Sequence, residues 1–315
     1  MTPFPISDLH PREYQHPLDE QAYEAMHAIP GFDKISKLFM KHGIERLFKV
    51  QYTGSNLEIT RANYPELIKI LEEVCLTIGI TKVPLLYVEW NDAINAHTIG
   101  SDTPIIVLSS GSIDRLSEPE LRFVIGHECG HIKGSHSQYQ SMAQSVSALG
   151  EFVGDWTLGV GKLASQPFQF ALTRWSRFSE LSCDRAGLLS CQDKNAAISV
   201  MIKMAGLPEK FNDSIFHDTF IQQAQRFEAI DFDTASKLVK FAAGLGRTHP
   251  WTVLRAAEII KWIEAGSYRA VLSRKSKKMV QVRNLEGVEF CRHCNYRLKG
   301  SEGFCPGCGI KLQEC

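Results

Sequence analysis

The chain has 315 residues, of which 44% are hydrophobic and 22% are charged, so it is long enough for one large globular domain with an appendage. Its 35 basic and 35 acidic residues give a formal net charge of zero, which excludes the strongly basic field of a typical nucleic-acid-binding protein. The sequence shows neither a signal peptide nor a run of about twenty apolar residues, and we expect a soluble cytoplasmic protein with reduced cysteines and no transmembrane segment.

The first third of the chain leads from an arm into a helix. Residues 1–30 are rich in proline and histidine, and we expect an irregular N-terminal arm. Its histidines lack a consistent ligand spacing and are expected at the surface: His10, His16 and His27. Residues 31–270 form the expected main domain, in which residues 64–78 have the apolar spacing of an amphipathic helix, with a proline in its first turn.

Three short strands are predicted next, over residues 84–90, 94–99 and 104–109. Each is rich in apolar residues, and the segments between them have turn residues such as Asn, Asp and Gly. Because short connections favour pairing between consecutive strands, we expect a small antiparallel sheet.

A helix with a strong start signal follows the strands. Ser117 and Glu120 have the spacing of a capping box. Further along, His127 and His131 are four residues apart, so both imidazoles share one face of the helix and can bind the same metal ion. Glu128 lies beside that face, where its carboxylate can take a proton from a metal-activated water.

A later helix, residues 171–188, carries candidate partners for these histidines. Glu180 is the best candidate for a third ligand, and Asp184, one turn on, can accept the remaining ring N–H of a ligand histidine. Arg177, one turn earlier, can balance the negative charge, and Gly187 would permit close helix packing. The alternative is that these charges form a solvated helix face.

The C-terminal part has a different composition. Residues 271–289 form a basic linker, and residues 290–315 contain two C-x-x-C pairs. This spacing is typical of a zinc ribbon, in which the metal would supply much of the folding free energy. The four expected ligands of this structural zinc are Cys291, Cys294, Cys305 and Cys308. A ribbon of this kind can engage a partner, and we expect a protein rather than a nucleic acid.

Four segments together resemble the HtpX and CaaX-prenyl-protease type of zinc metallopeptidase, which is a gluzincin family. In chain order they are Asn95-Ala96-His97, Glu120 to His131, Glu180 to Gly187, and Thr248-His249-Pro250 with Arg255 further on. Membrane-bound members of this family carry transmembrane helices, often between the active-site helix and the third ligand. That interval is interrupted by polar residues here, so the chain resembles the soluble branch.

The resemblance implies a role for each matching residue. His127, His131 and Glu180 would hold the catalytic zinc, and Glu128 would be the general base and then the proton donor to the leaving amine. A peptide substrate would pair along Asn95, Ala96 and His97. His249, supported by Arg255, would donate a hydrogen bond to the oxyanion, although a structural role in a turn is the alternative for His249.

The expected fold is therefore α+β: a mostly helical zincin-type metallopeptidase domain with a small antiparallel sheet, followed by a zinc ribbon. The expected function is that of a zinc metalloendopeptidase with one catalytic and one structural Zn²⁺, acting on protein or peptide substrates through a zinc-activated water. The alternative is a latent or non-catalytic module that uses the ribbon to bind a partner. Cys129 and Cys183 are expected to be small buried packing residues, and a redox-sensitive pair is the alternative.

Overall fold

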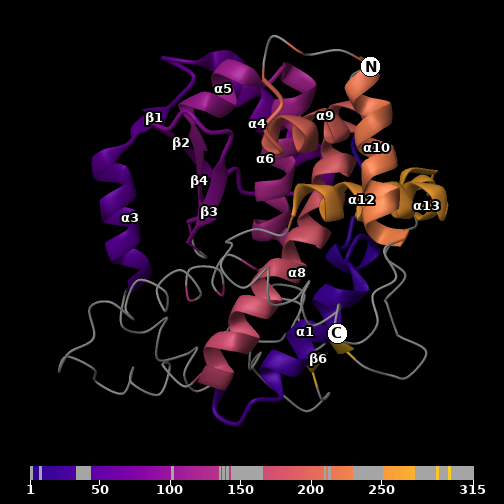
Figure 1. Ribbon diagram of the computed structural model, residues 1–315. Coiled ribbons are helices and arrows are strands. Elements are labelled where there is room, and N and C mark those ends of the chain that lie inside the picture. Colours follow the sequence, from indigo (N-terminus) through magenta and orange to yellow (C-terminus); the bar gives the residue numbers. More distant parts are fainter. Residues whose placement is uncertain are drawn as a thin grey trace.

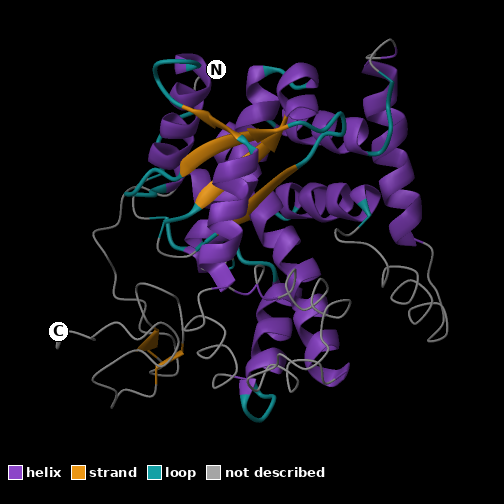
Figure 2. Cartoon of the chain, turned by 90° about the vertical axis from the view of Figure 1, so that its left-hand side faces the viewer, coloured by secondary structure: helices purple, strands orange, loops and turns teal. Residues whose placement is uncertain are grey.

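The computed structural model describes residues 3–6, 9–32, 44–100, 103–134, 136, 139, 142, 166–208, 211, 214–229, 251–273, 289–290 and 297–298. Within them, helices make up most of the protein and pack with a small four-stranded sheet (Figure 1). Figure 2 shows these strands as one twisted sheet lying against the helical body. The expected α+β class is confirmed.

The sheet is mixed rather than antiparallel throughout. Its order is β1-β2-β4-β3, and the strands are β1 (Leu57–Ile59), β2 (Leu85–Glu89), β3 (Ala96–Ile99) and β4 (Ile105–Ser109). β2 and β4 pair in parallel, whereas β1 pairs with β2 and β3 pairs with β4 in antiparallel fashion. The expected all-antiparallel sheet is wrong for β2 and β4, because the chain crosses to the edge strand β3 before β4 returns between them.

The three helices predicted at residues 64–78, from Ser117 onward and at residues 171–188 are present, and together with further helices and the sheet they enclose the core. Their bounds are α3 (Ile44–Ser55), α4 (Pro65–Ile78), α5 (Ser110–Arg115), α6 (Glu118–Lys133), α8 (Gln166–Cys191), α9 (Lys194–Met204), α10 (Ser214–Ala229), α12 (Thr252–Glu264) and α13 (Ser267–Ser273). The start of α6 is as predicted, because Glu120 accepts a hydrogen bond of 2.7 Å from the backbone N–H of Ser117. The short helix α5, which was not predicted, separates the sheet from α6.

The N-terminal segment contains regular structure, so the expectation of an irregular arm is wrong there. A short 3₁₀ helix (Pro11–Glu13) precedes α1 (Pro17–His27), whose start is capped by the His16 side chain. Asp19, Ala22 and Met26 are buried, and this spacing places them on one helical face. Because α1 packs against α8, the segment is part of the folded domain.

The most extensive helix contact among the described residues joins α6 and α8, which lie side by side in Figure 1. A Cβ atom added at Gly126 would lie 2.3 Å from the side chain of Ser190, and one at Gly187 would lie 2.7 Å from the backbone oxygen of Phe123. The two helices can approach this closely only because both positions lack a side chain. The close packing predicted at Gly187 is confirmed, and it brings the functional faces of α6 and α8 together.

The last described segments are two short strands, β5 (Glu289–Phe290) and β6 (Arg297–Leu298), which pair in antiparallel fashion. The four cysteines expected to bind the structural zinc lie outside the described residues, so the ribbon remains a prediction. No helix among the described residues has the length and apolar character needed to cross a membrane.

Candidate active site

Three side chains from two helices converge on one point. His127 and His131 project from α6, and Glu180 projects from α8. Nε2 of His127 lies 3.4 Å from Oε2 of Glu180, and Nε2 of His131 lies 3.2 Å from Oε1 of the same carboxylate. All three residues are buried, and one potential ligand atom from each lies within 4.8 Å of the others. The structure therefore brings the predicted His–His–Glu set together.

This arrangement fits a small divalent metal ion. With metal–nitrogen and metal–oxygen bonds of about 2.0–2.2 Å in a tetrahedron, neighbouring ligand atoms lie about 3.4 Å apart. The separations of 3.2 and 3.4 Å between the histidine nitrogens and Glu180 are close to this value. Three protein donors with one remaining position are typical of a catalytic zinc site rather than a structural one.

Asp184 and Arg255 fix the orientation of His127. Nδ1 of His127 donates to Oδ1 of Asp184 at 3.0 Å, and Arg255 on α12 donates to both oxygens of Asp184, at 2.8 and 2.5 Å. Burial alone would raise the pKa of Asp184, but the charge of Arg255 and hydrogen bonds from Arg255 and His127 hold it below its ordinary value. Because Asp184 is a carboxylate, it selects the tautomer of His127 that offers the Nε2 lone pair to a metal.

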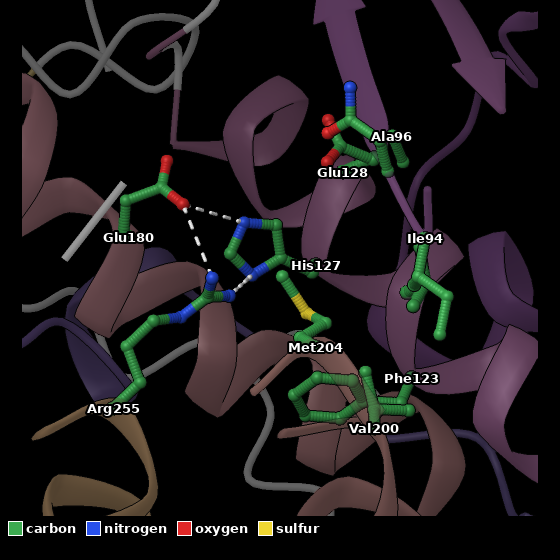
Figure 3. Close-up of a pocket in the computed structure, with 11 residues that line it drawn as sticks. Ile94, Ala96, Phe123, His127, Glu128, Glu180, Val200, Met204 and Arg255 are labelled. Atoms are coloured by element: carbon green, nitrogen blue, oxygen red, sulfur yellow. Dashed lines mark hydrogen bonds and ion pairs between the residues drawn. The ribbon is translucent and has the colours of Figure 1, made fainter. Parts of the chain in front are cut away.

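Arg255 also reaches the third ligand. Its Nη1 atom lies 3.9 Å from Oε2 of Glu180. Figure 3 shows Glu180 pointing at both His127 and Arg255, with dashed lines marking these interactions. A single guanidinium is thus shared by two buried carboxylates, Asp184 and Glu180.

Glu128 lies on the other side of His127 from Glu180, beside Ala96 (Figure 3). The hydroxyl of Thr98 in β3 donates to Oε2 of Glu128 at 2.7 Å, and both residues are buried. Thr98 was not among the predicted site residues. The strand alternation could have identified it, because Thr98 is two residues beyond Ala96 and therefore faces the same side of β3.

A pocket of about 30 Å³ opens beside these groups. Its lining combines polar groups of the site with an apolar wall: Ile94, Asn95, Ala96, Phe123, Val124, His127, Glu128, Glu180, Val200, Met204 and Arg255. Val200 and Met204 belong to α9, which is tied to the start of α6 by a 2.8 Å ion pair between Lys203 and Glu120. Sequence reasoning missed this wall, since nothing local indicates that α9 faces the pocket.

The predicted substrate strand is the edge strand β3. The backbone N–H of Asn95 donates to the hydroxyls of Ser109 and Ser112. Its C=O accepts from the Ser112 hydroxyl and from the backbone N–H of Ser109. Alternation along an antiparallel pair then turns the backbone groups of Ala96 and Thr98 away from β4. Among the described residues, the edge of the sheet is therefore open from Ala96 onward, and it runs beside Glu128.

The N-terminal segment contacts the two helices, α8 and α12, that carry Asp184 and Arg255. The backbone N–H of His16 donates to the Ser182 hydroxyl at 2.9 Å, and that hydroxyl donates to Oδ2 of Asp19 at 2.6 Å. Nε2 of His16 lies 2.9 Å from Oε2 of Glu258, one turn along α12 from Arg255. His16 is buried rather than at the surface, so that expectation is wrong, because its ring joins α1 to α12.

The other predicted residues are placed as follows. Arg177 lies one turn before Glu180 on α8, where burial lowers its pKa, and its role in charge balance remains a prediction. The ring of His97 packs on Tyr52, with ring centroids 4.9 Å apart. His249 lies outside the described residues. Cys129 and Cys183 are both fully buried, as expected of packing residues.

Comparison with known proteins points to one family. The model of peptidase family M48 matches residues 61–263. The plastoglobule-localized metallopeptidase 48 of Arabidopsis thaliana, a chloroplastic protein, is 29% identical over 279 residues, which is 88% of this chain and 79% of that protein.

Bacterial relatives give weaker or shorter matches. A protease HtpX homolog of Paraburkholderia phytofirmans is 24% identical over 258 residues, covering 76% of this chain and 86% of that protein. A protease HtpX homolog of Dictyoglomus turgidum is 32% identical over 108 residues, only 34% of this chain and 35% of that protein. No solved structure gives a significant match.

Proposed function

The chain belongs to peptidase family M48, and from this premise we propose that it is a zinc-dependent endopeptidase acting on protein or peptide substrates. One observation carries the proposal. The ligand atoms of His127, His131 and Glu180 converge within 4.8 Å beside the same pocket that Glu128 lines. Three donors, a nearby carboxylate and an open strand edge are the parts that hydrolysis of an extended peptide requires.

His127, His131 and Glu180 would hold the zinc ion, which supplies a Lewis acid that polarises the substrate carbonyl and acidifies a water molecule. Glu128 is the proton carrier. Thr98 engages its Oε2 atom, so Oε1, the oxygen that Thr98 does not engage, accepts the proton of the attacking water. The same carboxyl group then returns a proton to the leaving nitrogen.

The peptide would lie along β3 and add a strand to the open edge of the sheet. The outward backbone groups of Ala96 and Thr98 would pair with the substrate backbone, and one substrate side chain would enter the apolar wall of the pocket. His249, supported by Arg255, is proposed to donate a hydrogen bond to the oxyanion. We further propose a second, structural zinc bound by the four cysteines of the ribbon, which would serve a protein partner. We also propose a cytoplasmic location for this chain, whereas the name of the plant relative places that protein in plastoglobules.

The decisive test is the Glu128→Gln variant, with Glu118→Gln as the control because Glu118 is an exposed carboxylate on the same helix. Loss of a general base typically lowers the rate by about 100- to 10,000-fold. We expect Glu128→Gln to keep its zinc content by atomic absorption and to lose casein cleavage by about this factor, while Glu118→Gln cleaves normally.

Wild-type cleavage rates in the zinc-loaded Glu128→Gln protein would disprove the assignment. If zinc-loaded wild type does not cleave casein either, the alternative is favoured, namely a latent or non-catalytic zinc-binding module. Measured zinc content separates the two sites, because two ions per chain are expected when both the catalytic site and the ribbon are filled.

A further inference from the structure

A second cluster of metal-binding side chains lies directly beside the first. It consists of His131 on α6, His136 just after that helix, and Cys183 on α8. One potential ligand atom from each of the three lies within 4.8 Å of the others, and all three residues are buried. Neither His136 nor Cys183 takes part in the proposed hydrolysis.

The spacing within this cluster suits a metal ion. The Nδ1 atom of His136 lies 3.6 Å from the Sγ atom of Cys183. For a tetrahedral zinc ion with a Zn–N bond of about 2.0–2.1 Å and a Zn–S bond of about 2.3 Å, the nitrogen and sulfur ligands lie about 3.6 Å apart. The two atoms could therefore bind such an ion with little rearrangement.

A buried carboxylate lies near His136, as one does near His127 in the first site. Nε2 of His136 lies 3.8 Å from Oδ2 of Asp19, a buried carboxylate held by the Ser182 hydroxyl. The two atoms are beyond hydrogen-bond distance, so this contact is looser than the 3.0 Å hydrogen bond by which Asp184 orients His127. The N-terminal helix α1, which carries Asp19, would thus supply the outer contact of this second cluster.

A buried atom of His131 gives an independent indication. Its Nε2 atom lies 3.2 Å from Glu180, whereas its Nδ1 atom is buried and has no hydrogen-bond partner among the described residues. Metal-binding histidines almost always use both ring nitrogens, one for the metal and one for a hydrogen bond. An unpartnered buried nitrogen is unfavourable, and a ligand in the second cluster could relieve it.

We propose that His131, His136 and Cys183 form a second metal site within the peptidase domain, apart from the ribbon. This second site takes Zn²⁺ or another borderline divalent cation and inhibits the enzyme when it fills. The set of two nitrogens and one thiolate matches the preference of zinc. Binding releases two protons to solvent: the S–H proton of Cys183, which a metal–sulfur bond replaces, and the ring proton of His131, whose two nitrogens then each bind one ion. Because His131 belongs to both sets, its ring bridges the two ions when both sites are filled, and the second ion alters the ligand bond on which the first site depends. Only this inhibitory step rests on the proposed peptidase function.

Binding is tested without any activity measurement, by titrating the metal-free full-length protein with Co²⁺. Its thiolate-to-cobalt charge-transfer absorption reports a bound cysteine. We expect Cys183→Ser to bind one ion fewer than wild type, and the difference spectrum between the two to contain a thiolate band. Thiolates elsewhere in the chain cancel in that difference. Cys191→Ser is the matched control, because Cys191 is a buried cysteine on the same helix that bonds only to backbone oxygens, and it should bind like wild type.

His136→Gln tests the same site with every thiol retained, and circular dichroism shows which variants fold. It should also bind one ion fewer than wild type, and it decides the question if Cys183→Ser does not fold. Equal Co²⁺ stoichiometry in wild type and His136→Gln would overturn the site and leave the contact of His136 with Cys183 as a hydrogen bond.

The inhibitory role is tested with zinc and casein. Cleavage by wild type should fall as the zinc concentration is raised beyond the amount that activates, whereas Cys183→Ser should keep the activity that it has at low zinc. Equal inhibition of both would overturn the inhibitory role. If no protein cleaves casein, the proposed function fails, but the cobalt titration still decides the site.

Discussion

Replacing Asp184 with asparagine tests the charge network behind the metal ligands. Asp184 is 1% exposed, accepts two hydrogen bonds from Arg255 and accepts one from Nδ1 of His127. Asparagine has nearly the same shape, but it carries no charge and only one of its two terminal atoms can accept. The variant therefore leaves the Arg255 guanidinium, which is 3% exposed, without its principal counter-charge.

The expected cost follows from this burial. Removing one partner of a buried ion pair typically destabilises a protein by about 3–5 kcal/mol, because the remaining charge is left uncompensated. Glu180 lies 3.9 Å from Arg255 and offers partial compensation, so we expect the lower end, about 3 kcal/mol. The loss of the carboxylate from His127 should also weaken zinc binding by about 10- to 100-fold.

Two measurements separate these effects. Urea unfolding of the metal-free protein gives the free energy of unfolding, and competition with a chromophoric chelator gives the zinc affinity. The double variant Asp184→Asn/Arg255→Gln is the control, since it removes the guanidinium together with its principal counter-charge and should recover more than half of the lost stability. If Asp184→Asn unfolds within about 1 kcal/mol of wild type and binds zinc equally well, the network does not have the role argued for it.

The remaining predictions concern other parts of the site and its support. Thr98→Val removes the hydrogen bond to Glu128 and should lower kcat/KM by about tenfold or more with zinc content unchanged, whereas equal rates would show that the contact is dispensable. Gly126→Ala places a methyl group 2.3 Å from a side chain of α8 and should destabilise by about 1–3 kcal/mol, while Gly54→Ala, with open space around it, should not. Burial tends to raise the pKa of Glu258, but hydrogen bonds outweigh it and lower the pKa from 4.5 to about 2, so wild type should lose stability as the pH falls through this range. Between pH 5 and pH 3, the free energy of unfolding in urea should fall by about 1–2 kcal/mol more in wild type than in Glu258→Gln, allowing for solvent screening. Equal losses in the two proteins would contradict the pairing.

The parts of the fold that the sequence predicts are those with local causes. The capping box at Ser117 locates the start of α6, and the four-residue spacing of His127 and His131 needs only a helix to place both rings on one face. Gly187 indicates a close helix contact for an equally local reason. These features depend on a few neighbouring residues, and each appears in the structure where it was expected.

The parts that the sequence did not predict depend on contacts between distant segments. The parallel pairing of β2 with β4 follows from where β3 lies in the sheet, which no single strand encodes. The position of α9 at the pocket likewise depends on contacts between distant segments, which include core packing and the ion pair between Lys203 and Glu120. Thr98 and α1, by contrast, have local signals in the sequence. Strand alternation indicates Thr98, and the spacing of Asp19, Ala22 and Met26 indicates a helix with one buried face.

The N-terminal segment has a structural part in the active site although it precedes the matched residues 61–263. Arg255 and Glu258 are one turn apart on α12, and the first is bound by Asp184 of α8 while the second contacts His16. These two polar contacts, one turn apart, add to the buried apolar face of α12 in fixing the rotation of the helix about its axis. The His16 ring therefore helps to aim the Arg255 guanidinium at Asp184. Because the backbone N–H of His16 also binds Ser182 of α8, the segment holds both helices of this ion pair in register.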